Sequence, residues 1–169
     1  MPSQHIQPGP GQESVWDYPL PPRVEPFPGH IQIRFAGELI VDTRRALRVL
    51  ETSLPPGFYI PREDIRPGVL VPSERTSFCK WKGTARYFSV VLDGREAQDA
   101  AWNYPDPIPE AAMLKDYVAF YVAPMDECLV DGEKATPQPH SYFGGWVTSR
   151  VVGPFLGEPG AENVCGCEY

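Results

Sequence analysis

The sequence has no long apolar run and no basic stripe. No apolar stretch approaches the roughly 20 residues of a membrane-spanning helix, so we expect no membrane span. The N-terminus has no basic region followed by an apolar stretch, which predicts no secretory signal. The net charge is −7. Because binding to a phosphate backbone depends on clustered Lys and Arg, we expect no nucleic-acid partner.

Cysteine pairs of the kind that bind zinc are also missing. Of Cys79, Cys128, Cys165 and Cys167, only the last two stand close together. Structural zinc sites need two close cysteine pairs, or a pair with suitably spaced histidines. We therefore expect no metal and no disulfide scaffold, and we place the chain in a reducing cytoplasm. Nucleotide and flavin motifs are absent as well, which predicts no cofactor.

Proline is abundant instead, with 21 residues against the roughly 5% of an average protein. Together with 15 glycines it predicts many turns and little helix. Residues 1–29 hold eight of the prolines and no apolar period, which predicts an extended strap that lies against the rest. Residues 30–157 form one predicted β domain, and residues 158–169 a flexible C-terminal tail.

Alternation of apolar and polar residues marks the strands of this domain. Ile31, Ile33 and Phe35 alternate with polar neighbours, a period of two. For 45–52 a short helix competes with a strand, and the proline pair that follows favours the strand. Turn residues such as Asp93–Gly94 predict hairpins. Strands are predicted at 31–35, 39–41, 45–52, 58–60, 69–71, 87–92, 97–104, 117–122, 127–130 and 134–135, and short helices at 61–65 and 109–114.

The predicted fold is therefore mainly β, a compact antiparallel domain of two sheets with one or two short helices. The sheets should fold over one another around a central cavity or core. The run from Thr76 to Tyr87, followed by 101–107, combines a thiol, two lysines and several aromatics. Such a segment is able to line a ligand pocket.

Several ordered motifs resemble one family. They are Asp42-Thr43 with Leu50-Glu51, Phe58-Tyr59-Ile-Pro61, Cys79-x-Trp-Lys82-Gly83-x-Ala-x-Tyr87, Ala101-Trp102-x-Tyr104-x-x-Pro107, Val118-Ala-Phe-Tyr121, Val130-Asp-Gly-Glu133 and Phe143-Gly-Gly-Trp-Val-Thr-Ser149. Over about residues 15–157 the chain resembles the family called domain of unknown function 427. The resemblance implies a β-tent, two antiparallel sheets that meet at an angle. Zinc-binding β-tent proteins use two cysteine pairs, which this chain lacks.

Three residues are the candidates for chemistry. Glu51 ends a mostly apolar strand, and an inward-facing carboxylate there needs a cation. The family motif also holds Lys82, which we expect to pair with it for acid–base work. A salt bridge that only closes the two sheets is the alternative. Cys79 lies near Lys80 and Lys82, whose positive charge favours a thiolate. A buried structural cysteine is the alternative there.

Aromatic and basic residues complete the candidate pocket. Aromatics with polar tips line sites for flat organic ligands, although they also fill β cores. Basic side chains in turns near the same strand ends add polar contacts. The predicted ligand-binding residues are Tyr59, Trp81, Tyr87, Trp102, Tyr104, Arg44 and Arg62.

These residues predict a domain that binds a small organic molecule. The chemistry they favour is a cofactor-free acid–base reaction of the isomerase, lyase or cyclase type. A non-catalytic protein-interaction module is the alternative, in which the proline-rich strap and the glycine-rich segment around Trp146 present a surface. The sequence leaves homo-oligomerisation open.

Overall fold

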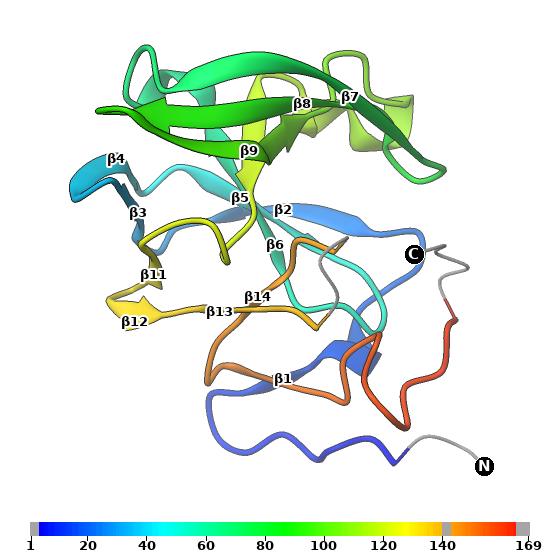
Figure 1. Cartoon of the computed structure of the whole chain (residues 1–169). Coiled ribbons are helices and arrows are strands. Elements are labelled where there is room, and N and C mark those ends of the chain that lie inside the picture. The colour runs from blue at the N-terminus through cyan, green and yellow to red at the C-terminus, as the bar shows by residue number, and fades with distance from the viewer. Residues whose placement is uncertain (1–3, 140–142, 165–169) are drawn as a thin grey trace.

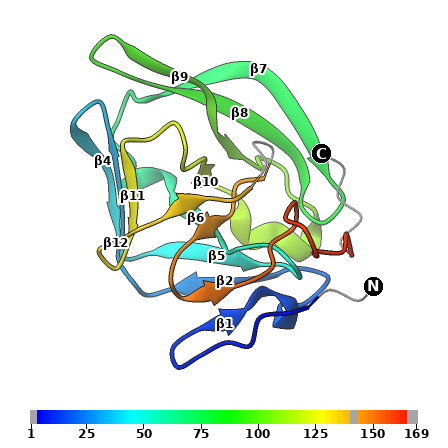
Figure 2. The ribbon, with the colours of Figure 1, turned by 60° about the horizontal axis from the view of Figure 1, so that its bottom comes forward.

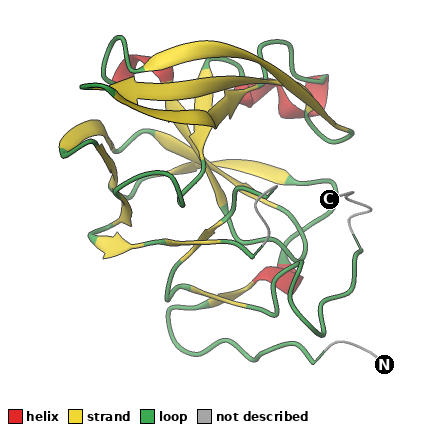
Figure 3. Ribbon diagram, in the orientation of Figure 1, coloured by secondary structure: helices red, strands yellow, loops and turns green. Residues whose placement is uncertain are grey.

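A computed structural model describes residues 4–139 and 143–164, and Cys165 and Cys167 lie outside these residues. Short strands joined by turns make up the described chain, with three short 3₁₀ helices (Figures 1 and 3). The mainly antiparallel β fold expected from the sequence is therefore confirmed. None of the described helices is long and apolar enough to cross a membrane.

The strands follow one another closely along the chain, with few residues between them. The strands are β1 (Glu13–Ser14), β2 (Arg23–Phe27), β3 (Ile31–Phe35), β4 (Glu38–Thr43), β5 (Ala46–Leu50), β6 (Gly57–Pro61), β7 (Leu70–Cys79), β8 (Gly83–Leu92), β9 (Arg95–Asn103), β10 (Tyr117–Phe120), β11 (Glu127–Val130), β12 (Glu133–Lys134), β13 (Thr136–Pro137), β14 (Trp146–Val147) and β15 (Val151–Val152). The 3₁₀ helices are η1 (Val15–Asp17), η2 (Arg62–Asp64) and η3 (Pro109–Leu114).

Two large antiparallel sheets carry the fold. Seven strands pair in the order β2-β5-β6-β10-β9-β8-β7, and four in the order β12-β11-β3-β4. The large sheet curves so that β7 and β8 lie over β2 and β5, with the four-stranded sheet along one side (Figure 2). Two small pairs add to this arrangement, β13 with β14 and β1 with β15, and the second of these is parallel.

Three hairpin turns have the backbone that their sequences predict. Both residues of Ala36–Gly37, Asp93–Gly94 and Asp131–Gly132 have positive φ, between 48° and 83°. Two successive positive φ values match the right-handed twist of the flanking strands, and glycine and aspartate tolerate them well. These turns therefore join β3 to β4, β8 to β9 and β11 to β12 in tight registers.

The main core lies between the two large sheets. Ile31, Ile33 and Phe35 of β3 are fully buried, as their alternation predicted. Trp146 joins them from the late glycine-rich segment and is 1% exposed. Its indole N–H donates to the carbonyl of Phe120 at 3.1 Å, which satisfies the one polar atom of this large side chain.

Two strands differ from the expectation. Residues 23–27, expected as part of an extended strap, form β2 and pair with β5. Proline is tolerated there because β2 is an edge strand of the sheet. The strand expected at 69–71 continues to Cys79 as β7, past an irregularity between Pro72 and Thr76. The second half of β7 has a polar sequence that does not indicate a strand, because an edge strand exposes much of its length to solvent.

The segment before β2 is held to the sheet by an ion-pair network. Arg48 of β5 donates to both carboxylate oxygens of Glu13, at 2.7 and 3.1 Å, and to Glu25 at 2.8 Å. The Tyr18 hydroxyl donates to Glu13 at 3.1 Å. The Arg48 side chain is 19% exposed, so solvent screens these bonds only in part. The hydrogen bonds from Arg48, together with its positive charge, hold the pKa of Glu13 below its ordinary value.

We predict that Arg48→Met lowers the free energy of unfolding by about 2 kcal/mol at neutral pH, because charge-assisted hydrogen bonds are lost. A lowered pKa stabilises the fold above the unfolded-state value, and that contribution disappears as the pH falls through the folded-state value. The difference between wild type and variant should therefore be smaller at pH 3 than at pH 7. Urea unfolding at both pH values measures it.

Arg86→Met on β8 is the matched control, because Arg86 is exposed. We expect this control to change stability by less than about 0.5 kcal/mol. A loss as large as that of Arg48→Met would contradict the importance of the network.

Candidate functional site

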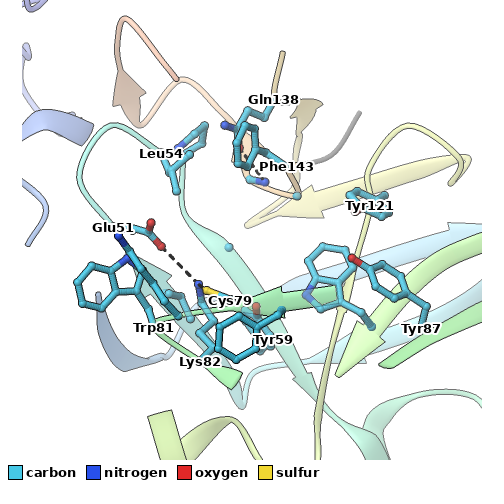
Figure 4. Close-up of a pocket in the computed structure, with 18 residues that line it drawn as sticks. Glu51, Leu54, Tyr59, Cys79, Trp81, Lys82, Tyr87, Tyr121, Gln138 and Phe143 are labelled. Carbon is cyan, nitrogen blue, oxygen red and sulfur yellow. Dashed lines mark hydrogen bonds and ion pairs between the residues drawn. The ribbon is translucent and has the colours of Figure 1, made fainter. Parts of the chain in front are cut away.

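A cavity of about 390 Å³ opens on the face of the large sheet that does not carry the main core (Figure 4). Its walls come from β5, β6, β8 and β9, from the β7–β8 turn, and from Gln138 and residues 143–145. The volume lies within the range of small-molecule sites. The sequence-predicted residues that line it are Glu51, Tyr59, Cys79, Trp81, Lys82, Tyr87 and Trp102.

Strand alternation explains why aromatic side chains gather here. Successive side chains of a strand point to opposite faces of the sheet. On β6, Phe58 and Ile60 enter the main core, whereas Tyr59 between them points to the cavity side. Tyr87 on β8 and Trp102 on β9 face the same side. Their ring centroids lie 6.2 Å apart, so they form one continuous aromatic wall.

Glu51 reaches the cavity by the same rule. Leu47 and Val49 of β5 belong to the cavity-side cluster, and Glu51 follows two positions later. Glu51 is 4% exposed. Burying a carboxylate this deeply costs desolvation free energy unless a cation or hydrogen-bond donors interact with it. The site therefore includes a charged group placed in a largely apolar wall.

Lys82 supplies the cation from the turn between β7 and β8. Its Nζ lies 3.4 Å from Oε1 of Glu51 and 3.7 Å from Sγ of Cys79 (Figure 4). The two charged side chains are 12% and 5% exposed. The structure thus brings all three candidates for chemistry together, although Glu51 stands 31 positions before Lys82.

The backbone holds this turn in place at two points. The Lys82 N–H donates to the Cys79 carbonyl at 3.1 Å, and the Ile108 N–H donates to the Lys82 carbonyl at 2.9 Å. Gly83 follows with φ +118°, and a Cβ there would lie 3.3 Å from the Asp106 carbonyl oxygen. A residue without a side chain is needed where two backbone segments come this close. The side chain of Lys82 therefore extends from a backbone that is held in place.

Electrostatics keep the lysine charged. Burial alone lowers the pKa of Lys82, but the hydroxyl oxygen of Tyr59, the carboxylate of Glu51 and the sulfur of Cys79 more than offset it. The pKa of Lys82 therefore lies above its ordinary value. At neutral pH the group is an ammonium, a hydrogen-bond donor rather than a nucleophile.

Tyr59 has its hydroxyl inside a small polar network. Burial raises its pKa, while the Lys82 ammonium and hydrogen bonds from Trp102 and Tyr104 act in the opposite direction. The pKa of Tyr104 lies well above its ordinary value, first because it is buried and then because Tyr59 is near. Both phenols are therefore neutral at neutral pH, and Tyr59 is the one that faces the cavity.

Two glycines bring a late segment onto the aromatic wall. A Cβ on Gly144 would lie 2.1 Å from the Trp102 ring, so only glycine permits this contact. The Gly145 N–H donates to the side-chain oxygen of Gln138 at 3.1 Å, and Gln138 is 4% exposed. The buried amide thus fixes the glycine segment against Trp102.

Three predicted ligand residues do not line the cavity. Tyr104 lies behind Tyr59, with ring centroids 6.4 Å apart. Arg44 is exposed and outside the cavity. Arg62 of η2 is exposed too, with its guanidinium 5.0 Å from the centroid of the Phe88 ring. The turns that hold these arginines lie near the site in sequence, but the sheet carries them elsewhere.

Sequence reasoning missed other lining residues. Tyr121 packs on Trp102 at 4.5 Å between ring centroids, and Gln138 and Phe143 line the opposite wall. Phe143 belongs to a motif that carried the family resemblance, which was a usable signal. Gln138 stands between two prolines in a segment without periodicity, so nothing in the sequence marks it.

The described residues contain no group of three or more His, Cys, Asp and Glu that could hold a metal ion. Cys128, the other cysteine among the residues described, is fully buried in the main core. Burial raises the pKa of its thiol, which makes it unreactive.

The chain matches the model of a known protein family. The family model described as Domain of unknown function (DUF427) matches residues 23–131, more than half of the 169-residue chain. The matched range includes Glu51, Tyr59, Cys79, Lys82 and Trp102. No curated protein matches the chain.

We predict that Lys82→Met lowers the free energy of unfolding by about 3 kcal/mol, because the Glu51 carboxylate loses its ion-pair partner in a buried place. Glu51→Gln/Lys82→Met should recover most of this loss, since it removes both charges. Thermal and urea unfolding of the two variants test the pair. Unchanged stability in Lys82→Met would show that the ion pair does not support the fold.

The same pair predicts a pH dependence. A raised lysine pKa stabilises the fold fully below the unfolded-state value of about 10.4, and this contribution is lost as the pH rises through the folded-state value. The stability difference between wild type and Lys82→Met should be constant from pH 7 to pH 9 and narrow above about 10.4. A difference that grows with alkaline pH would contradict the assignment.

We also predict that Gly83→Ala costs about 2–3 kcal/mol, because its φ of +118° is unfavourable for alanine and the Asp106 carbonyl is close. Gly94→Ala is the control. It also has a positive φ, +79°, but open space around it, and should cost about 1 kcal/mol. Equal losses in urea unfolding would show that the contact with residues 106–108 does not constrain the turn.

Proposed function

We propose that this chain, which belongs to the Domain of unknown function (DUF427) family, binds a small organic molecule in the aromatic cavity and performs a cofactor-free acid–base reaction on it. The observation that carries the proposal is the Glu51–Lys82 ion pair in the cavity wall. An apolar pocket with a few convergent polar groups is the usual form of a ligand site.

The arrangement of donors supports binding of an oxygen-bearing ligand. A lysine ammonium has three N–H donors. Within the described residues its hydrogen-bond partners are Glu51 and Cys79, so one donor is available to a ligand oxygen. The aromatic walls around Tyr59 and Trp102 would hold the flat apolar part of the same molecule. Polar and apolar recognition are thus side by side.

The chemistry follows from the two charges. The Glu51 carboxylate is suited to take a proton from a carbon next to a carbonyl, and the Lys82 ammonium is suited to stabilise the oxyanion that develops. Lys82 carries the positive charge that its role needs, because its pKa lies above its ordinary value. Reactions of the isomerase, lyase or cyclase type use this pairing of base and acid without a cofactor.

The same proposal includes a cytoplasmic chain whose partner is a small organic molecule and not nucleic acid or a membrane. The net charge of −7 and the free thiols of Cys79 and Cys128, the two cysteines that the structure describes, support it. Association of copies of the chain is left open.

One observation favours a protein-interaction module as the second candidate. The features that first suggested it are packed inside: Trp146 is 1% exposed, and Val15 in the strap is fully buried. Phe78, however, is 70% exposed on the edge strand β7 at the mouth of the cavity. An exposed aromatic beside a free strand edge is a common feature of peptide-binding sites.

Native mass spectrometry of the chain purified from its own source tests the first candidate. We expect the wild type to carry a small molecule that is released on unfolding. Glu51→Gln/Lys82→Met should carry less of it, because the ligand oxygen loses its donor. Lys115→Met, which changes an exposed lysine away from the cavity, should keep the wild-type amount.

A fragment library screened by thermal shift gives a second measurement. Equal ligand content in all three proteins, or a library without any fragment that stabilises the wild type more than the double variant, would contradict the proposal. Co-purification of a polypeptide that is lost in Phe78→Ser would favour the interaction module instead.

A further inference from the structure

The acid–base proposal leaves one group of the cavity unused, the thiol of Cys79. Cys79 ends β7, is half-buried, and lines the cavity together with Lys82. Its Sγ lies 3.7 Å from Nζ of Lys82, and Figure 4 shows the sulfur directly beside that amine. The hydrogen bond from the Lys82 N–H to the Cys79 carbonyl closes the turn between them. The thiol and the ammonium are therefore held as a fixed pair.

The environment of Cys79 differs from that of Cys128. Cys128 is fully buried among apolar residues, with the acidic Glu127 as its charged neighbour. Cys79 has an ammonium within 4 Å and faces a cavity. A thiolate is the nucleophilic form of cysteine, and a nearby cation stabilises it. Among the described cysteines, Cys79 alone combines access with an adjacent positive charge.

The spacing of the pair matches a conjugated carbonyl compound. In the s-cis conformer of an α,β-unsaturated ketone, bond lengths and angles place the β-carbon and the carbonyl oxygen about 3 Å apart. Attack needs sulfur about 3–3.5 Å from the β-carbon. A hydrogen bond needs nitrogen about 2.7–3.2 Å from the oxygen. A flat molecule bridging Sγ and Nζ, 3.7 Å apart, makes both contacts at once.

The walls of the cavity suit the shape of such a molecule. Conjugation keeps these compounds planar, and the rings of Tyr59, Trp81, Tyr87 and Trp102 line the space. At roughly 30 Å³ for each small group, 390 Å³ holds about a dozen non-hydrogen atoms. This is the size of an enone with one aromatic ring.

We propose that the cavity takes planar α,β-unsaturated carbonyl compounds and that Cys79 adds reversibly to their β-carbon while Lys82 holds the carbonyl oxygen. This inference rests on the proposed function and names the substrate class of the same site. It also gives Cys79 the role of a catalytic nucleophile, which the acid–base proposal does not require.

The addition balances without any further reactant. The sulfur–carbon bond forms as the electron pair of the carbon–carbon double bond moves toward the carbonyl, which becomes an enolate. The Lys82 ammonium donates a hydrogen bond to the enolate oxygen and keeps its proton. The thiol proton passes to the Glu51–Lys82 pair and from there to the α-carbon. Rotation about the new single bond followed by reversal returns the thiol and an alkene of changed geometry, an isomerisation.

The probe that tests this is trans-4-phenyl-3-buten-2-one, with the saturated ketone 4-phenylbutan-2-one as its matched control. Among the described cysteines we expect the probe to add to Cys79 alone, one molecule in each wild-type chain, and peptide mapping should locate it there. Cys128 should stay unmodified until urea unfolds the chain. The saturated ketone should form no adduct but should slow alkylation of Cys79 by iodoacetamide.

Three variants separate the roles of the residues. Glu51→Gln/Lys82→Met keeps an uncharged wall and should slow the addition about 100-fold, the usual loss when an oxyanion donor is removed. Lys115→Met is the control: Lys115 is exposed and does not line the cavity, and its loss should leave the rate close to that of the wild type. Cys79→Ser should form no adduct at the cavity but still bind the saturated ketone in equilibrium dialysis. Thermal melting verifies that each variant is folded.

The outcomes distinguish this inference from the proposed function. If the saturated ketone binds but Cys79 reacts no faster than in the urea-unfolded chain, the nucleophile is wrong and the binding site stands. A rate unchanged in the folded double variant overturns the pairing of thiol and ammonium. If neither compound binds or reacts, both this inference and the pocket proposal for carbonyl ligands fail.

Discussion

The large sheet is buried on both faces, and this constraint organises the rest of the molecule. One face packs against the four-stranded sheet, and the other carries the aromatic cavity. Because side chains alternate along each strand, every central strand supplies both faces. Phe58 and Tyr59, or Ala101 and Trp102, are neighbours in sequence but belong to different clusters. The main core and the cavity wall are two sides of the same strands.

Two buried faces also explain how the cavity wall is supported. Tyr59, Tyr87 and Trp102 stand on strands whose neighbouring residues pack into the main core. The polar groups come from the margins of the sheet: Glu51 just beyond β5, and Cys79 and Lys82 around the β7–β8 turn. A rigid apolar wall with polar groups at its margin is a suitable arrangement for positioning a small molecule.

Burial of the Glu51–Lys82 pair opposes folding through desolvation. Removing two charges from water costs free energy, and the attraction between them offsets this cost only when their geometry is good. At 3.4 Å the contact is long for a charge-assisted hydrogen bond, whose usual length is about 2.7–2.9 Å. The Lys82 ammonium also contacts Sγ of Cys79 at 3.7 Å, so its donors are divided between two partners.

Much of the architecture could be predicted from local patterns. The alternation in Ile31–Phe35 and the turn residues of Asp93–Gly94 act over a few residues, and both gave the structure they predict. β2 and the second half of β7 were missed, because edge strands tolerate proline and polar residues that look like loop. Packing against a neighbouring strand, and not local preference, makes these segments extended.

The candidate site likewise has a part that could be predicted from the sequence and a part that could not. The sequence by itself determined which residues could carry chemistry: a carboxylate in an apolar strand, a thiol followed by two nearby lysines, and aromatics at strand positions. Only the tertiary structure decided which of them meet. It brought Glu51 to Lys82, moved Arg44 and Arg62 away, placed Tyr104 behind Tyr59, and added Gln138. The physical reason is that residue chemistry is local, whereas proximity depends on sheet curvature and on strand pairings between distant segments.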